Sequence, residues 1–164
     1  PGAEVVLREN ASETLLKSNA GQYRNLHIAS HGIFNAEDPM ASALLLSESD
    51  QDDGLLSVAE LFDLRLNADL VTLSACETAL GEVTGGDDVI GFTRGFLYAG
   101  AESIVASLWK VSDAATNQLM QAFYEDLPEQ GKSAALRQAQ LALKGGYYDH
   151  PYYWAAFQLT GEYD

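Results

Sequence analysis

Two side chains suited to nucleophilic chemistry follow apolar runs that are typical of buried strands. Cys76, the only cysteine, comes directly after Asp69–Ala75, and His31 comes directly after Leu26–Ser30. Active sites of parallel α/β sheets lie at the carboxyl ends of the strands, so we expect both side chains at that edge. An imidazole beside a thiol favours the thiolate and can then protonate a leaving amine. The pair therefore predicts a catalytic dyad.

Each of these residues also has a structural interpretation. A strand cysteine is often a small core residue, and a lone histidine is more often structural than catalytic. The place of Cys76 at a strand end favours the catalytic interpretation. A cysteine-dependent phosphatase would need an arginine in the loop after the cysteine, where Glu82 stands instead. Gly32 adds to the dyad, because its backbone N–H can approach a substrate closely and could form an oxyanion hole with the Cys76 N–H.

Apolar runs and helix signals alternate along the chain. The sequence predicts a mostly parallel sheet covered by helices on both sides, because its strands read as apolar on both faces. Strands are expected at Ala3–Leu7, Leu26–Ser30, Asp69–Ala75, Ser103–Trp109 and Trp154–Leu159, with a hairpin formed by Ala43–Leu46 and Gly54–Leu56. Helices are expected at Ser12–Ala20, Ser57–Leu61, Asp88–Tyr98, Ser112–Leu127 and Lys132–Lys144.

Composition excludes several classes of function. The 164 residues carry a net charge of −15, with no Lys/Arg stripe, which argues against nucleic-acid binding. Such acidity serves solubility or attracts basic peptides. No apolar run is long enough to cross a membrane. A single cysteine excludes an internal disulfide and a multi-thiolate zinc site, and favours a cytoplasmic setting.

Three further features have both a functional and a structural interpretation. His27 shares a strand face with His31, but no third metal ligand is legible nearby, so we expect a core or supporting role. His150 lies in an aromatic block and is interpreted as structural. The glycine-bearing segment Gly81–Asp87 is either an activation loop or an ordinary surface loop.

Five ordered sequence blocks carry a resemblance to a known family. They are Leu26–Gly32, Asp69–Gly81, Phe96–Ala101, Ser107–Val111 and His150–Phe157. In these blocks the chain resembles the CHAT domain, a caspase-like family that is related to separase and is often joined to tetratricopeptide repeats. The resemblance implies a three-layer α/β/α sandwich and peptide-bond hydrolysis, with His31 and Cys76 in the catalytic positions. It also implies one domain over residues 1–164, without the N-terminal part of a full CHAT domain.

The resemblance further implies where a substrate side chain is recognised. In caspase-like folds the loop after the strand Ser103–Trp109 lines the pocket for the residue before the cleaved bond, so Asp113 would suit Arg or Lys. Asp113 is equally well explained as the first-turn acid of a helix. Trp109 could form an apolar pocket wall or cap the core. Glu77 is a weaker pocket candidate, as are Asp87 and Asp88.

Two functions from different classes stay open at this point. The first is a cysteine endopeptidase that acts on polypeptides, cleaves after a basic residue and needs no metal or organic cofactor. The second is a non-catalytic caspase-like module in a larger regulatory protein. A tetratricopeptide-repeat region is the expected partner in the full-length protein.

Overall fold

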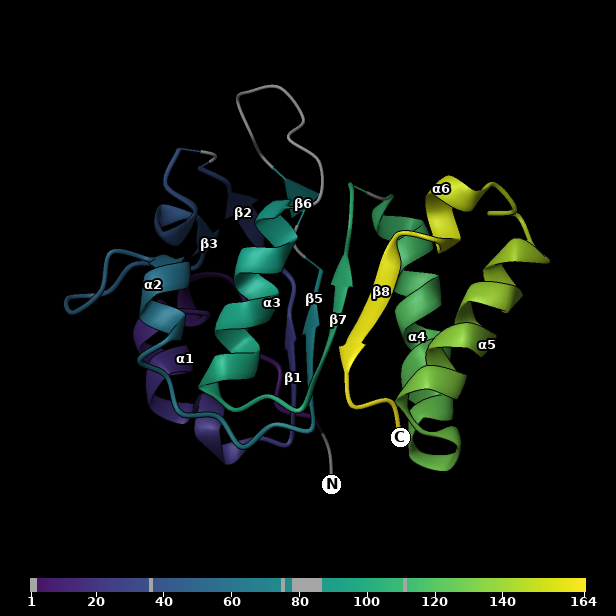
Figure 1. The fold of residues 1–164 in the computed structure, drawn as a ribbon, viewed down its shortest axis with the longest axis horizontal. Helices are drawn as coiled ribbons and strands as arrows, with labels where there is room; N and C mark the ends of the chain where they lie inside the picture. Colours follow the sequence, from purple (N-terminus) through teal and green to yellow (C-terminus); the bar gives the residue numbers. More distant parts are fainter. Residues whose placement is uncertain (1–2, 36, 75, 78–86, 111) are drawn as a thin grey trace.

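A four-stranded main sheet forms the centre of the molecule (Figure 1). The computed structural model describes residues 3–35, 37–74, 76–77, 87–110 and 112–164. The strand order is β1-β5-β7-β8, and only β8 runs antiparallel to its neighbour. The bounds are β1 Asn25–Ile28, β5 Leu70–Leu73, β7 Ser103–Ser107 and β8 Phe157–Gly161.

A second, smaller sheet lies beyond the carboxyl ends of β1 and β5 (Figure 1). Its order is β4-β3-β2-β6, in which β2 and β6 are parallel and the other pairs antiparallel. The bounds are β2 His31–Ile33, β3 Ala43–Leu45, β4 Leu55–Ser57 and β6 Cys76–Glu77. The sequence did not predict this sheet as a separate unit, because β2 and β6 are too short to show a periodic pattern.

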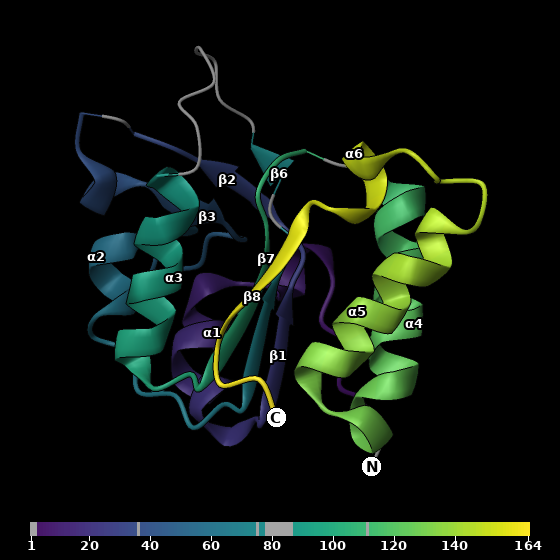
Figure 2. The same ribbon diagram turned by 45° about the vertical axis from the view of Figure 1, so that its right-hand side comes forward.

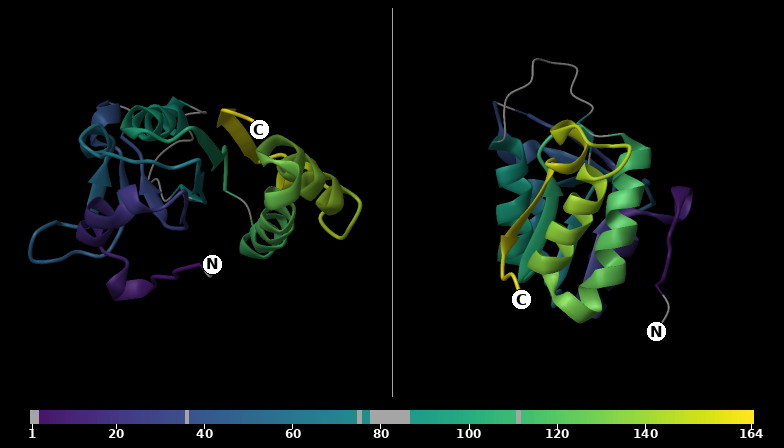
Figure 3. Two further views of the ribbon diagram at one scale, coloured as in Figure 1. Left: turned by 90° about the horizontal axis from the view of Figure 1, so that it is seen from below. Right: turned by 90° about the vertical axis from the view of Figure 1, so that its right-hand side faces the viewer.

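Helices cover both faces of the main sheet (Figure 2). The bounds are α1 Glu13–Asn19, α2 Val58–Leu61, α3 Asp87–Ala99, α4 Asp113–Gln130, α5 Lys132–Lys144 and α6 Pro151–Trp154. Short 3₁₀ turns are η1 Arg8–Asn10, η2 Ala20–Gln22 and η3 Pro39–Ala41. Figure 3 shows the α4–α5 pair on the opposite side of the sheet from α2 and α3. None of the helices among the described residues is long and apolar enough to span a bilayer.

Two apolar cores follow from the alternation of side chains along the strands. In β5, Val71 and Leu73 pack with Phe92 and Phe96 of α3 on one face. Leu70 contributes to the other core. The remaining members of that second core come from β7, β8, α4, α5 and the segment before β8, and they are Val105, Ala115, Leu119, Met120, Phe123, Ala135, Leu136, Ala139, Leu143, Ala156 and Phe157. All residues of β5 and β7 are buried, so these strands are covered on both faces as predicted.

The predicted mixed α/β class and the mostly parallel main sheet are confirmed. The hairpin appears as β3–β4, and the predicted helix after Ser57 begins with a capping box formed by Ser57 and Glu60. Gly100 ends α3 with φ +112°, a conformation that strongly favours glycine.

Four predictions about individual elements were wrong. Ala3–Leu7 is not a strand, because no neighbouring strand pairs with it in the described residues. β1 is buried on one face only, since it lies at the edge of the main sheet. α4 continues through Pro128 to Gln130, where Gly131 with φ +77° ends it. The last strand begins at Phe157 rather than Trp154, which belongs to α6.

Lys17 joins three carboxylates that come from separate segments. Its Nζ lies 2.5 Å from Glu13, 2.8 Å from Asp52 and 2.8 Å from Glu60. Glu13 is buried, and its other oxygen accepts the Gly54 N–H at 2.9 Å. The ammonium therefore ties α1 to α2 and to the acidic turn before β4.

The charges of this cluster reinforce one another. Partial burial opposes ionisation of Glu60, but the Lys17 ammonium and hydrogen bonds from Ser57 outweigh it and lower the pKa of Glu60 to about 2. The Lys17 ammonium, with a hydrogen bond from Thr14, also lowers the pKa of Asp52. Although burial opposes its charge, hydrogen bonds to the three carboxylates raise the pKa of Lys17.

Substitution Lys17→Met is expected to lower the free energy of unfolding by about 3 kcal/mol at neutral pH, because it leaves buried Glu13 without a cation. Carboxylates with a lowered pKa stabilise the fold above their ordinary pKa, which is 4.5 for Glu60, and lose that effect as the pH falls through about 2. The difference between the two proteins should therefore shrink over that range in urea unfolding. Arg137→Met, at an exposed position on α5, is the control. A difference that does not change with pH would contradict the assignment.

Candidate active site

His31 and Cys76 occupy paired positions on neighbouring strands. β2 and β6 are parallel, with His31 opposite Cys76 and Gly32 opposite Glu77. Neighbouring strands are about 4.8 Å apart, so the backbones of the two predicted dyad residues lie side by side. We expected the pair at the carboxyl ends of the main-sheet strands. It lies a few residues further along the chain, in β2 and β6 of the second sheet.

The main sheet sets this pairing. β1 pairs with β5 in the register Asn25↔Leu70 to Ile28↔Leu73, and the sequence offset between partners is the same for His31 and Cys76. The pairing of β2 with β6 therefore keeps the register of β1 with β5. Ile28 and Leu73 are both buried in the first core, and a one-residue slip would turn such side chains to the opposite face.

Gly32 lies buried between β3 and β6. A Cβ at this position would lie 3.3 Å from the ring of Phe34, which is tighter than ordinary packing. The Phe34 ring in turn packs edge-on against Phe92 of α3, with centroids 5.8 Å apart. The strand that carries His31 is thus anchored to the first core through Phe34. His31 itself is exposed.

His27 links the two main-sheet strands that lead to the dyad positions. Its Nε2 lies 3.2 Å from Oγ of Ser74, which follows β5. Its ring lies against Tyr124 of α4, with centroids 5.7 Å apart, and the Tyr124 hydroxyl donates to Oγ1 of Thr72 at 2.8 Å. Although part of His27 faces an open cavity, burial of the ring lowers its pKa below the usual 6.5. The supporting role expected for His27 agrees with these contacts.

An open cavity of about 670 Å³ lies between the main sheet and α4. His27 and Ser74 line it from the sheet side. The helix contributes residues that recur at helical spacing, among them Asp113, Thr116, Asn117, Met120, Gln121 and Tyr124. Glu125 also lines the cavity, and none of the lining residues that the structure describes is Lys or Arg. The cavity therefore suits a ligand with a positive charge.

The structure places the other predicted site residues as follows. Asp113 is the first residue of α4, is exposed and lines the cavity. Trp109 does not line it; its indole N–H donates to the Tyr152 carbonyl at 2.9 Å. His150 caps α6 by accepting the Tyr152 N–H on Nδ1, which agrees with its structural interpretation. The side chains of Cys76, Glu77, Asp87 and Asp88 lie outside the described part, as do residues 81–86 of the predicted loop.

Two residues of this region were missed from the sequence. Tyr124 covers His27, and Tyr152 contacts the segment after β7. The spacing of Asp113, Asn117, Met120 and Tyr124 on one face of α4 was the available signal for Tyr124. No sequence signal distinguishes Tyr152 from its aromatic neighbours.

One group of acidic residues has the spacing of a metal site. Carboxylate oxygens of Glu13, Asp52 and Glu60 lie within 4.8 Å of one another. Lys17 already supplies the positive charge among them, so they form an ion-pair cluster. We assign no metal to it.

His27 is partly open to the cavity, and removal of the Tyr124 ring should expose it further to water. We expect Tyr124→Ala to raise the pKa of His27 towards 6.5, because the burial that lowers it is relieved. Titration of the histidine ring protons by NMR would measure the change. Tyr147→Ala removes an equally large ring at an exposed site and should leave His27 unaltered. A His27 pKa that stays the same in Tyr124→Ala would show that Tyr124 does not cause the shift.

Comparison with known proteins agrees with the resemblance in the sequence blocks. The profile of the CHAT domain matches residues 1–162. Tetratricopeptide repeat protein 28 from mouse is 41% identical over 109 residues, which is 65% of this chain and 4% of the relative. The human protein of the same name is 40% identical over 109 residues, with the same coverage.

The matched part is thus a small fraction of much longer proteins, whose name describes tetratricopeptide repeats. The profile match, in contrast, takes in almost all of this chain, including His31 and Cys76. The chain therefore belongs to the CHAT domain family, a caspase-like family.

Proposed function

We propose that this domain is a cysteine endopeptidase with His31 and Cys76 as its dyad. The observation that carries the proposal is the parallel register that pairs these two positions across β2 and β6. A histidine and a cysteine on neighbouring parallel strands can bring an imidazole beside a thiol. Membership of a caspase-like family supports the same chemistry. We further propose that the sheet and its two helical layers form the caspase-like three-layer sandwich.

The reaction begins with proton transfer from the Cys76 thiol to His31. The thiolate attacks the scissile carbonyl carbon, and the oxyanion that forms accepts hydrogen bonds from the Gly32 and Cys76 N–H groups. His31 then donates its proton to the leaving amine, which breaks the peptide bond and leaves a thioester. Water, deprotonated by His31, hydrolyses the thioester and restores the thiol. This chemistry requires no metal or organic cofactor.

A basic side chain before the cleaved bond is the proposed specificity. Asp113 is exposed at the cavity beside α4, and among the described lining residues no Lys or Arg neutralises it. A carboxylate that receives Arg or Lys gains charge-assisted hydrogen bonds. Glu77 pairs in register with Gly32 next to the dyad, and Trp109 lies in the segment that leads to α4. We propose both as further contacts for the polypeptide substrate.

Alkylation of Cys76 tests the dyad directly. We expect iodoacetamide to modify Cys76 fast, and His31→Ala to slow the reaction by at least about tenfold, since the thiolate loses its partner. Peptide cleavage should fall by a factor of about 10² or more in His31→Ala and vanish in Cys76→Ala. His150→Asn, which keeps a good helix cap, is the matched histidine control and should behave as the wild type. Slow labelling that does not depend on His31 would sink the peptidase proposal.

Cleavage of a peptide library tests the pocket. The wild type should prefer Arg or Lys before the cleaved bond, and Asp113→Asn should reduce that preference by about 10- to 100-fold, as expected when a charge-assisted hydrogen bond to the substrate is removed. Glu129→Gln, near the other end of the same helix, should change nothing. A preference for basic residues that persists in Asp113→Asn would refute the role of Asp113.

A non-catalytic module is the second candidate. The name of the relatives refers to tetratricopeptide repeats and does not mention an enzyme activity. This favours a domain that serves assembly within a repeat protein. That function would require no reactive thiol at Cys76. The alkylation experiment above therefore separates the two candidates.

A further inference from the structure

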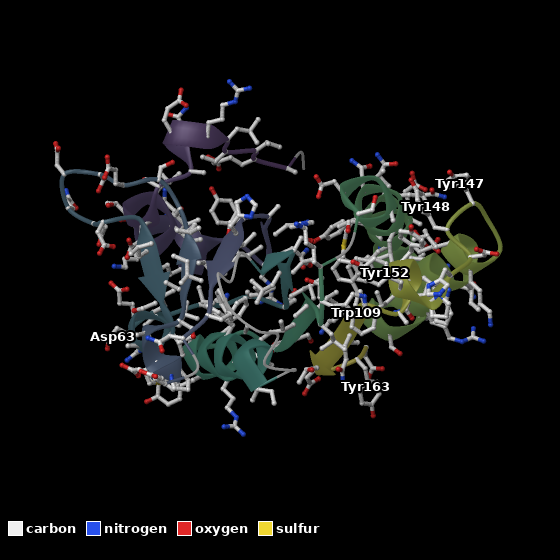
Figure 4. All side chains as sticks on the ribbon, turned by 90° about the horizontal axis from the view of Figure 1, so that it is seen from above. Asp63, Trp109, Tyr147, Tyr148, Tyr152 and Tyr163 are labelled. Atoms are coloured by element: carbon white, nitrogen blue, oxygen red, sulfur yellow. The ribbon has the colours of Figure 1, made fainter. Side chains whose placement is uncertain are left out.

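Each residue of the segment 108–110, which follows β7, forms a hydrogen bond with α6 or with the residue that precedes β8. The Leu108 N–H donates to the Ala156 carbonyl at 2.8 Å. The Trp109 indole N–H donates to the Tyr152 carbonyl at 2.9 Å, and the Tyr152 hydroxyl donates to the Lys110 carbonyl. Trp109 and Tyr152 lie side by side in Figure 4. Three consecutive residues are thus attached to one short helix and its end.

The helix that makes these contacts is itself well supported. His150 caps it, and the Trp154 indole N–H donates to the Asp149 carbonyl at 3.0 Å. The Tyr152 ring packs edge-on against Tyr153, with centroids 5.5 Å apart. Tyr153 in turn lies 5.2 Å from Tyr148. The Tyr152 hydroxyl is therefore presented from a fixed ring.

Apolar burial contributes to the path of this segment, but it has no direction and does not by itself place the Lys110 carbonyl. Trp109 is 38% exposed and Tyr152 45% exposed, so each ring also keeps a large part of its surface in water. Directly after the segment, Ser112 stands at the N-cap of α4 but makes no side-chain capping hydrogen bond. Core packing fixes α4 from the fully buried Ala115 onward. Asp113 precedes that contact and has no side-chain cap ahead of it, so the hydrogen bonds of the preceding segment add to its placement.

We infer that Tyr152 is a positioning residue for substrate recognition, because its hydroxyl holds Lys110 and thereby places Asp113 at the cavity. The inference rests on the proposed peptidase function. It assigns a role to the aromatic block His150–Phe157, of which the dyad chemistry makes no use. Tyr152 acts through the segment and does not need to touch the substrate.

The test is Tyr152→Phe, which keeps the ring and the backbone carbonyl but deletes the donor to Lys110. We expect kcat/KM for a peptide with Arg before the cleaved bond to fall about tenfold, mainly through a higher KM. The rate of Cys76 alkylation and the melting temperature should stay at wild-type values. Tyr147→Phe is the control, because Tyr147 is 89% exposed and its hydroxyl has no partner among the described residues. A fall that appears only in kcat, or none at all, would overturn the inference.

Hydrogen exchange gives a readout that does not depend on cleavage. Backbone amides of residues 108–110, 112 and 113 should exchange faster in Tyr152→Phe and at the wild-type rate in Tyr147→Phe. Unchanged exchange in Tyr152→Phe would overturn the inference even if the wild type cleaves peptides. A different outcome is faster exchange in Tyr152→Phe together with a wild type that cleaves no peptide. That result would refute the proposed function and the role of Tyr152 in recognition, but the attachment of the segment to α6 would stand.

Discussion

Parallel pairing between β1 and β5 is the constraint on which the rest of the structure depends. Parallel neighbours cannot be joined by a tight turn, so the chain must leave the sheet and return between them. The intervening residues form β2, β3 and β4 of the second sheet and also α2, which lies over one face. The buried side chains of Ile28 and Leu73 then hold the register that continues into His31 and Cys76.

Packing turns this pairing into a rigid platform. Leu44 and Leu56 of the second sheet are fully buried in the same core as Phe96 of α3, so the two sheets cannot move independently. On the opposite face, α4 and α5 pack on each other and on Leu70 and Val105. The cavity forms where α4 stands away from the β1 edge, between these two well-packed regions.

Polar contacts complete what the apolar cores leave undetermined. Lys17 holds three carboxylates together and so ties α1 to α2 and to the turn before β4. His27 of β1 contacts Ser74, which follows the neighbouring strand β5. The segment after β7 buries part of Leu108 and Trp109 and is held in addition by hydrogen bonds to α6. The residues proposed to recognise a substrate thus depend on directional contacts as well as packing, whereas the positions of the proposed dyad depend on strand register.

The sequence by itself determined the mixed α/β class, the two central strands, most helices and the dyad candidates. These follow from local signals: apolar runs in β5 and β7, the capping box of Ser57 and Glu60, and glycine at the end of α3. Only the tertiary structure decided the second sheet, the one-sided burial of β1 and the contacts of Tyr124 and Tyr152. The reason is physical, because short strands and side-chain hydrogen bonds between distant segments have no local periodicity. They exist only once the main sheet has brought their partners together.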